Sequence, residues 1–192
     1  MNYRTKIRWM ALLFSLPCAS SATMAGTSSS ETSMPLLNPD DASINAFQIM
    51  CTLSPGTFED IAYRARAMRM RMTLDQTTKP AEGLTSHIEV FEGNLTTGPF
   101  TLLLEKITKD GMAADNCGVG TSTRDTDTFT QNVIKTLNIG QITPKKIQLN
   151  GHSLTIWDDA YGPKSSLNLT DLSGRNEVIL QRIYGFRSPS RP

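Results

Sequence analysis

The three cysteines, Cys18, Cys51 and Cys117, constrain the fold of this 192-residue chain more than any other feature. An odd number of cysteines is unfavourable in an oxidising compartment, because one thiol would stay unpaired. Removal of an N-terminal signal peptide that contains Cys18 leaves one pair, so we expect a Cys51–Cys117 disulfide bond. This bond would close a loop of about 66 residues and contribute roughly 4 kcal/mol in the chain-entropy model.

The N-terminus, residues 1–25, has the three parts of a secretory signal peptide. Basic residues from Arg4 to Arg8 precede a short apolar run that ends at Leu16, and small residues follow up to Ala22 and Ala25, the two expected cleavage positions. The apolar run is too short to cross a bilayer, which takes about 20 residues. We therefore expect a periplasmic or secreted protein with no stable membrane insertion after cleavage.

An alternative makes Cys18 the lipid-modified cysteine of a lipoprotein. Pro17 argues against it, because a small, flexible residue normally occupies that place.

The charge of the chain bears on whether it binds nucleic acid. The chain has 19 Lys and Arg and 18 Asp and Glu, which gives a net charge of +1. Nucleic-acid-binding domains are usually strongly basic, so we expect no nucleic-acid partner.

Composition divides the rest of the chain into three parts. Residues 26–43 are rich in Ser, Thr and Pro without periodicity, which predicts a disordered linker. Residues 44–186 carry the periodic apolar patterns of one folded domain, and residues 187–192 form a flexible tail. No internal repeat is visible in the sequence.

Two helices are predicted. Apolar residues recur at helical spacing from Phe58, with Thr57 as N-cap and Asp60 as its partner, and this helix ends near Met68. The second helix starts at a cap between Asp125 and Thr128, a stretch that also resembles a calcium loop but lacks most of its ligands.

Alternating apolar and polar residues predict about six to seven strands in the remainder. The pairs Asp110-Gly111 and Asn150-Gly151 each lie between such runs and are typical of tight hairpin turns. Hairpins join antiparallel strands, so the expected fold is α+β: a mostly antiparallel sheet with two helices in a single domain. The segment around Pro80 is interpreted as a loop.

A basic stretch at the end of the first helix is the candidate binding face. It comprises Arg64, Arg66, Arg69 and Arg71. The favoured interpretation of these residues is a solvated helix face, since basic side chains near a helix C-terminus are favoured by the helix dipole. A contact for an anionic partner is the alternative.

Catalytic machinery is sparse, so the expectation for enzyme activity leans towards none. The chain lacks nucleophile-elbow and metalloprotease motifs, and its two histidines, His87 and His152, are interpreted as structural or solvated. We expect no cofactor and no metal. One polar and aromatic cluster at a strand end is a candidate carboxylate site, formed by Trp157, Asp158, Asp159 and Tyr161.

The segments "FQIMC" from Phe47 to Cys51, "GPFTLLLEKITKDGMAADNCGV" and "FTQNVIKTLNIG" resemble small, uncharacterised exported proteins of proteobacteria. Such proteins have a Phe and a Cys before the first helix and a second Cys that closes a strand. The resemblance implies a single disulfide bond and a periplasmic location, and it implies no activity.

These features predict an exported, non-enzymatic binding or accessory protein of the cell envelope, with an unknown envelope or secreted protein as partner. Two alternatives remain open. One is an inhibitor or immunity-type protein against a secreted enzyme, and the other is a small envelope enzyme that uses carboxylates such as Asp158 and Asp159. A convergent polar cleft around the Asp pair would favour the enzyme, whereas a flat apolar surface would favour binding.

Overall fold

The computed structural model describes residues 39–53, 56–95, 98–123, 125–149, 151–172 and 175–185. All of them belong to the compact unit Pro35–Pro192. The predicted signal peptide, most of the predicted linker and the predicted tail lie outside the described residues.

Three α-helices and one π-helix occur in the described part of the chain. α1 (Pro39–Phe47) runs directly into the π-helix η1 (Gln48–Thr52), and α2 (Phe58–Ala67) follows it closely. α3 (Thr126–Thr136) comes after the fourth strand. α1 begins inside the segment 26–43 that the sequence predicts to be disordered, so the folded domain starts earlier than residue 44.

The two predicted helix caps are confirmed. The side-chain oxygen of Thr57 accepts a hydrogen bond from the backbone N–H of Asp60 at 3.3 Å, and its hydroxyl donates to the Asp60 carboxylate. Asp125 accepts hydrogen bonds from the backbone N–H groups of Asp127 and Thr128 at 3.0 and 3.1 Å. These bonds satisfy amide groups that have no partner inside the helix, and they set where α2 and α3 begin.

Eight strands form one sheet in the described residues, and every neighbouring pair is antiparallel. Their order is β1-β2-β3-β4-β8-β7-β6-β5. The strands are β1 (Arg71–Ala81), β2 (Leu84–Leu95), β3 (Gly98–Lys109), β4 (Met112–Ser122), β5 (Lys145–Leu149), β6 (His152–Asp158), β7 (Ser165–Leu172) and β8 (Glu177–Tyr184).

This order divides the sheet into two similar halves. In each half a helical segment is followed by four strands that pair in sequence, β1 to β4 after α2 and β5 to β8 after α3. The last strands of the two halves, β4 and β8, pair with each other at the middle of the sheet. The structure therefore contains a topological repeat that the sequence does not reveal.

The predicted α+β class and the antiparallel sheet are confirmed, but the predicted six to seven strands and two helices are too few. The missed strand is β1, which includes Pro80. Proline is tolerated in a strand at the edge of a sheet, where its missing N–H leaves no ladder bond unmade, and β1 is an edge strand. The missed helical elements are α1 and η1, and Cys51 lies within η1.

The predicted disulfide bond is confirmed. It joins Cys51 in η1 to Cys117 in β4, with the two Cα atoms 5.4 Å apart. Both residues are buried, in a core that contains Phe47 and Met50 from the helical layer and Leu104 from β3. The bond thus links the helical layer covalently to the centre of the sheet.

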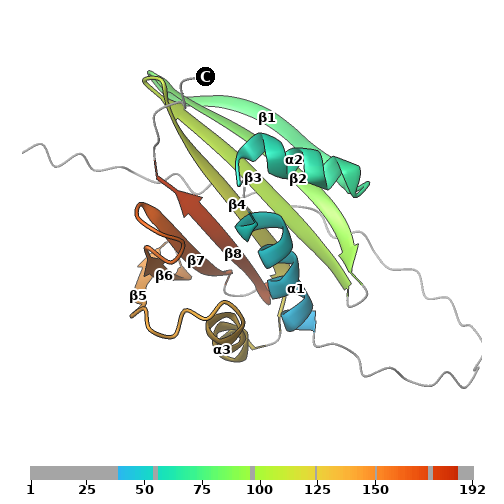
Figure 1. Cartoon of the computed structure of the whole chain (residues 1–192), viewed down its shortest axis with the longest axis vertical. Helices are drawn as coiled ribbons and strands as arrows, with labels where there is room; N and C mark the ends of the chain where they lie inside the picture. The colour runs from blue at the N-terminus through green and yellow to red at the C-terminus, as the bar shows by residue number, and fades with distance from the viewer. Residues whose placement is uncertain are drawn as a thin grey trace, which may run out of the picture. The chain divides into compact units, whose positions relative to one another are not determined.

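All helical elements of the described residues pack on one face of the sheet, which we call the helix face. Ser43 of α1 donates a hydrogen bond to Thr121 of β4, Cys51 of η1 is bonded to β4, and Arg66 of α2 pairs with Glu89 of β2. In the view of Figure 1, α1 and α2 are seen over the sheet. The opposite face, the open face, has no helix of the described residues against it.

Candidate functional site

The second strand, β2, directs its side chains in an unusual way. His87 and Glu89 point towards α2: the His87 ring packs edge-on against Phe58, and Glu89 binds Arg66. Because side chains alternate along a strand, Ile88 and Val90 point to the open face. In an antiparallel sheet with one solvated face, the apolar residues normally face the core and the polar ones face away. From His87 to Val90 this orientation is reversed: the polar side chains point to the helix face and the apolar side chains point to the open face.

The reversal places apolar side chains side by side across several strands of the open face. The pairing register puts Leu74 of β1 beside Val90 of β2, and Val90 beside Leu103 of β3. Ile88 and Ile107 lie on the same face of β2 and β3, and all five side chains are partly exposed. We call these five residues the apolar patch of the open face.

A polar group is set into this patch. The Glu105 carboxylate of β3 accepts hydrogen bonds from the Ser86 hydroxyl at 2.8 Å and from the Asn116 side-chain N–H at 2.9 Å. Ser86 and Asn116 are 6% and 3% exposed, although no helix of the described residues covers them. Asn116 Oδ1 is buried and has no hydrogen-bond partner among the described residues. Of the polar side chains in this group, the partly exposed Glu105 carboxylate is the acceptor that an incoming surface could reach.

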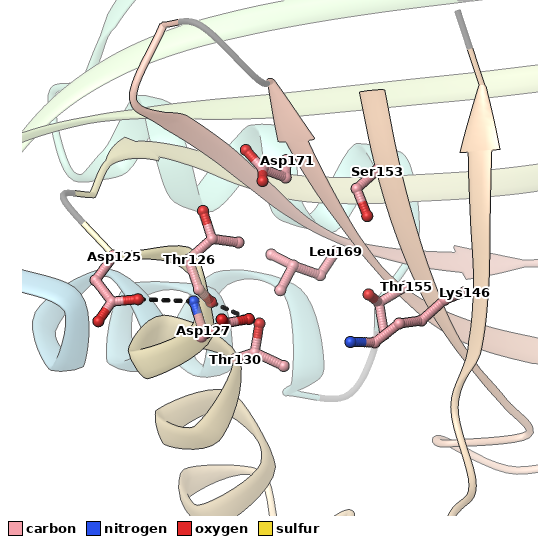
Figure 2. Close-up of a pocket in the computed structure, with 9 residues that line it drawn as sticks. All are labelled: Asp125, Thr126, Asp127, Thr130, Lys146, Ser153, Thr155, Leu169 and Asp171. Carbon is pink, nitrogen blue, oxygen red and sulfur yellow. Dashed lines mark hydrogen bonds between the residues drawn. The ribbon is translucent and has the colours of Figure 1, made fainter. Parts of the chain in front are cut away.

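A second site is a polar pocket of about 310 Å³ on the helix face, between the start of α3 and strands β5 to β7 (Figure 2). The cap hydrogen bonds, with Thr128 as the main donor, lower the pKa of Asp125 and commit its carboxylate to α3. The lining is almost entirely polar, unlike most small-molecule sites. It consists of Asp125, Thr126, Asp127, Thr130, Lys146, Ser153, Thr155, Leu169 and Asp171.

A third site is a charged cluster on the paired strands β1 and β2, beside α2. His87 Nε2 lies 3.3 Å from Asp75 Oδ1 and 3.5 Å from Glu89 Oε1. His87 Nδ1 lies 3.1 Å from the Thr77 hydroxyl. Arg66 Nη2 donates to both Glu89 oxygens, at 2.6 and 2.7 Å. One imidazole and two carboxylates therefore converge beside the helix.

The four arginines of the candidate binding face do not act as one surface. Arg66 is tied to Glu89 and lies 5.6 Å from the centre of the Phe91 ring. Arg64 donates to the Met50 carbonyl at 3.1 Å, and Arg71 pairs with Glu92 on the neighbouring strand. Arg69 is exposed, at a backbone position with φ of 57°. Two of these residues therefore hold α2 in place.

The polar and aromatic cluster is also divided. Trp157 is fully buried in the core, and Asp158 pairs with Lys145 of β5, a hydrogen bond that raises the pKa of the lysine. Asp159 accepts a hydrogen bond from the backbone N–H of Lys164 at 3.1 Å and so closes a turn. Burial, opposed in part by Arg182, raises the pKa of Tyr161 to about 12. The two carboxylates have separate partners, and neither lines the polar pocket.

No helix in the described part of the chain is long and apolar enough to cross a membrane. Comparison with protein-family models, with curated proteins and with solved structures gives no match for this chain. The fold thus defines an α+β class with a one-sided helical layer. The resemblance to exported proteobacterial proteins stays a prediction, and function has to be argued from the chain's own residues.

Sequence reasoning missed the apolar patch and the charged cluster for the same reason. Both depend on β1 and on which face of β2 meets α2. A signal for the cluster was present, because Asp75, Thr77, His87 and Glu89 alternate in the sequence at the two-residue spacing of a strand. The interpretation of the segment around Pro80 as a loop hid that pattern.

Proposed function

We propose that this chain is an exported, non-enzymatic binding or accessory protein of the cell envelope, and that it holds a protein partner on the open face of its sheet. The observation that carries the proposal is the reversed orientation of β2, which directs Ile88 and Val90 away from the helical layer. Contiguous apolar surface on a folded protein is a common mark of an interaction site.

The chemistry of the open face specifies the partner. An apolar protein surface would pack on Leu74, Val90 and Leu103, and a donor group on that surface would meet the carboxylate of Glu105. A lysine, arginine or amide side chain fits this role, because a buried acceptor left without a donor costs about 1–3 kcal/mol. An interface of this kind has an apolar centre with a small number of oriented polar contacts.

Two other observations support this reading over the enzyme alternative. Asp158 and Asp159 each have a separate partner and do not converge on a shared substrate position. Both mature cysteines are bonded to each other, so neither is available as a nucleophile. The disulfide bond also fits the oxidising periplasm or the exterior of the cell, which the predicted signal peptide implies. The alternative in which this chain is an inhibitor belongs to the same class of function, with a secreted enzyme as the protein partner.

Site-specific photo-crosslinking in cells of the native host tests the proposal. A photoreactive phenylalanine analogue is placed on the open face, at Leu103 or at Ile183, which is the cross-strand neighbour of Asn116 in β8. Tyr63, which is 72% exposed on α2, is the matched control position. We expect both open-face positions to form an adduct with the same envelope or secreted protein, and the control to form none.

Each variant is first checked for a wild-type melting curve and for the absence of free thiols. An adduct at Tyr63 with none at the open face would contradict the proposal and would move the binding surface to the helical layer. Adducts only with this chain itself, or only with lipid, would contradict it as well.

A further inference from the structure

The charged cluster at the edge of the sheet has the composition of a metal site. His87 supplies an imidazole nitrogen, and Asp75 and Glu89 supply carboxylate oxygens, with the three candidate ligand atoms within 4.8 Å of one another. Imidazole and carboxylate ligands are typical of zinc and of other divalent transition metals. The separate binding surface proposed above does not use these residues.

The distances favour a shared cation over a direct hydrogen bond. A charge-assisted N–H···O bond measures about 2.7–2.9 Å, and both contacts of His87 Nε2 are longer, at 3.3 and 3.5 Å. Two ligands bound tetrahedrally to zinc at about 2.0–2.1 Å lie about 3.3–3.4 Å from each other. The observed separations therefore match two edges of a zinc coordination tetrahedron.

The surroundings of His87 prepare the nitrogen that would bind the metal. Thr77 lies at hydrogen-bond distance from Nδ1, so a proton on Nδ1 that is donated to its hydroxyl leaves the lone pair of Nε2 facing the carboxylates. Nε2 is inaccessible to solvent and makes no hydrogen bond to the described part of the chain. Metal-binding histidines almost always donate their other ring N–H to a neighbouring acceptor in this way.

The local charges are compatible with a bound divalent cation. Asp75 and Glu89 carry two negative charges, and Arg66, which binds both oxygens of Glu89, supplies one positive charge. Lys106, the cross-strand neighbour of His87, pairs with Glu59 of α2. Partial burial of Glu59 opposes ionisation, but the hydrogen bond from Lys106, a backbone hydrogen bond and the charge of Lys106 together outweigh it and lower the pKa of this carboxyl group.

We infer that Asp75, His87 and Glu89 form a binding site for a divalent cation of the zinc class. With three protein ligands, a fourth coordination position stays open for water or for a donor group of another molecule. Because Asp75 lies on the edge strand β1 and Glu89 is tied to α2, the cation would also fasten the sheet edge to the helical layer.

Calorimetric titration of the full exported protein with zinc chloride tests the inference. The protein is prepared without an affinity tag and freed of metal with a chelator. We expect one zinc ion per chain and a rise of about 5 °C or more in melting temperature at a hundredfold excess over Kd. Cobalt(II) should give the intense visible absorption of a tetrahedral site.

Four variants separate this site from adventitious binding. Asp75→Asn and His87→Ala should each weaken zinc binding at least tenfold, and Asp75 is exposed enough for its variant to fold normally. Thr77→Val should weaken it about tenfold through loss of the orienting hydrogen bond. Glu92→Gln is the matched control, because it removes an exposed carboxylate from β2, the strand that carries His87 and Glu89. This variant should bind zinc as the wild type does.

Three results would overturn the inference. They are the absence of zinc binding at millimolar concentration, zinc binding that Asp75→Asn and His87→Ala leave unchanged, and equal weakening by Glu92→Gln. Photo-crosslinking at Leu103 is scored independently, so failure of either proposal is distinguishable from failure of the other.

Discussion

The guanidinium group of Arg182 lies directly against the backbone of Gly56. Its Nη2 donates a hydrogen bond to the Gly56 carbonyl at 3.0 Å, and a Cβ atom at Gly56 would lie 2.3 Å from the same nitrogen. Arg182 is 1% exposed and its guanidinium carbon lies 4.1 Å from the centre of the Tyr184 ring. A charged residue of β8 thus fixes the segment that leads into α2, across the two halves of the sheet.

Gly56→Ala should therefore destabilise the protein by about 1–3 kcal/mol, because the added methyl group has to displace a packed side chain. Urea unfolding measures the difference. Gly120→Ala is the control, since its nearest contacts are an ordinary 3.7–3.9 Å, and it should leave stability unchanged or slightly higher. If Gly56→Ala costs as much in an Arg182→Met background as in the wild type, the contact with Arg182 is not the cause.

Replacing both Cys51 and Cys117 by alanine should lower the free energy of unfolding by about 2–5 kcal/mol. The bond joins η1 to β4, so hydrogen exchange should increase first in residues 48–67, which contain η1 and α2. Denatured protein from the periplasm, alkylated without reductant, should show no free thiol. Two reactive thiols per mature chain would refute both the bond and the oxidising location.

Arg66 and Arg71 should differ in their contribution to stability. Arg66→Ser leaves the Glu89 carboxylate, 6% exposed, without its ion pair, and should cost about 1–3 kcal/mol. Arg71→Ser removes a solvated pair with Glu92 and should change stability by no more than about 0.5 kcal/mol. Both are measured by urea unfolding with a chelator present. Small and equal effects of the two substitutions would show that Arg66 and Arg71 both belong to a solvated face.

Tyr161 should make stability depend on pH in the alkaline range. Its pKa is raised to about 12, so folding favours the neutral phenol, and this contribution is complete below about pH 10 and lost as pH rises towards 12. Tyr161→Phe should remove that part of the pH dependence in alkaline unfolding curves. At pH 7 it should not destabilise, because the buried hydroxyl has no hydrogen-bond partner in the described structure. Ionisation of Tyr161 near pH 10 in the folded protein would contradict the raised pKa.

Local features were predictable because each depends on a few neighbouring residues. The caps at Thr57 and Asp125, the end of the first helix and the turn at Asp110-Gly111 all follow from short-range hydrogen bonds and backbone preferences. The disulfide bond followed from counting cysteines after removal of a signal peptide. None of these steps requires knowledge of where distant segments meet.

The arrangement of the sheet and the positions of the candidate sites could not be predicted from the sequence to the same extent, because they depend on contacts between distant segments. An alternating pattern in β2 shows that Ile88 and Val90 share a face, but a two-residue period cannot tell which face meets α2. The ion pair between Arg66 and Glu89 decides that orientation. The same packing of α2 on β2 creates the charged cluster on one side and leaves the apolar patch on the other.

The affinity of the crosslinked partner for variants of the open face tests the central claim most directly. Leu103→Asn replaces an apolar side chain in the middle of the apolar patch by a polar one. Tyr63→Ala removes an exposed aromatic side chain from α2, on the helix face of the sheet. Calorimetry should show at least a tenfold higher Kd for Leu103→Asn, equivalent to about 1.4 kcal/mol, and an unchanged Kd for Tyr63→Ala. An unchanged Kd for a properly folded Leu103→Asn protein, or an equal loss with Tyr63→Ala, would contradict binding through the open face.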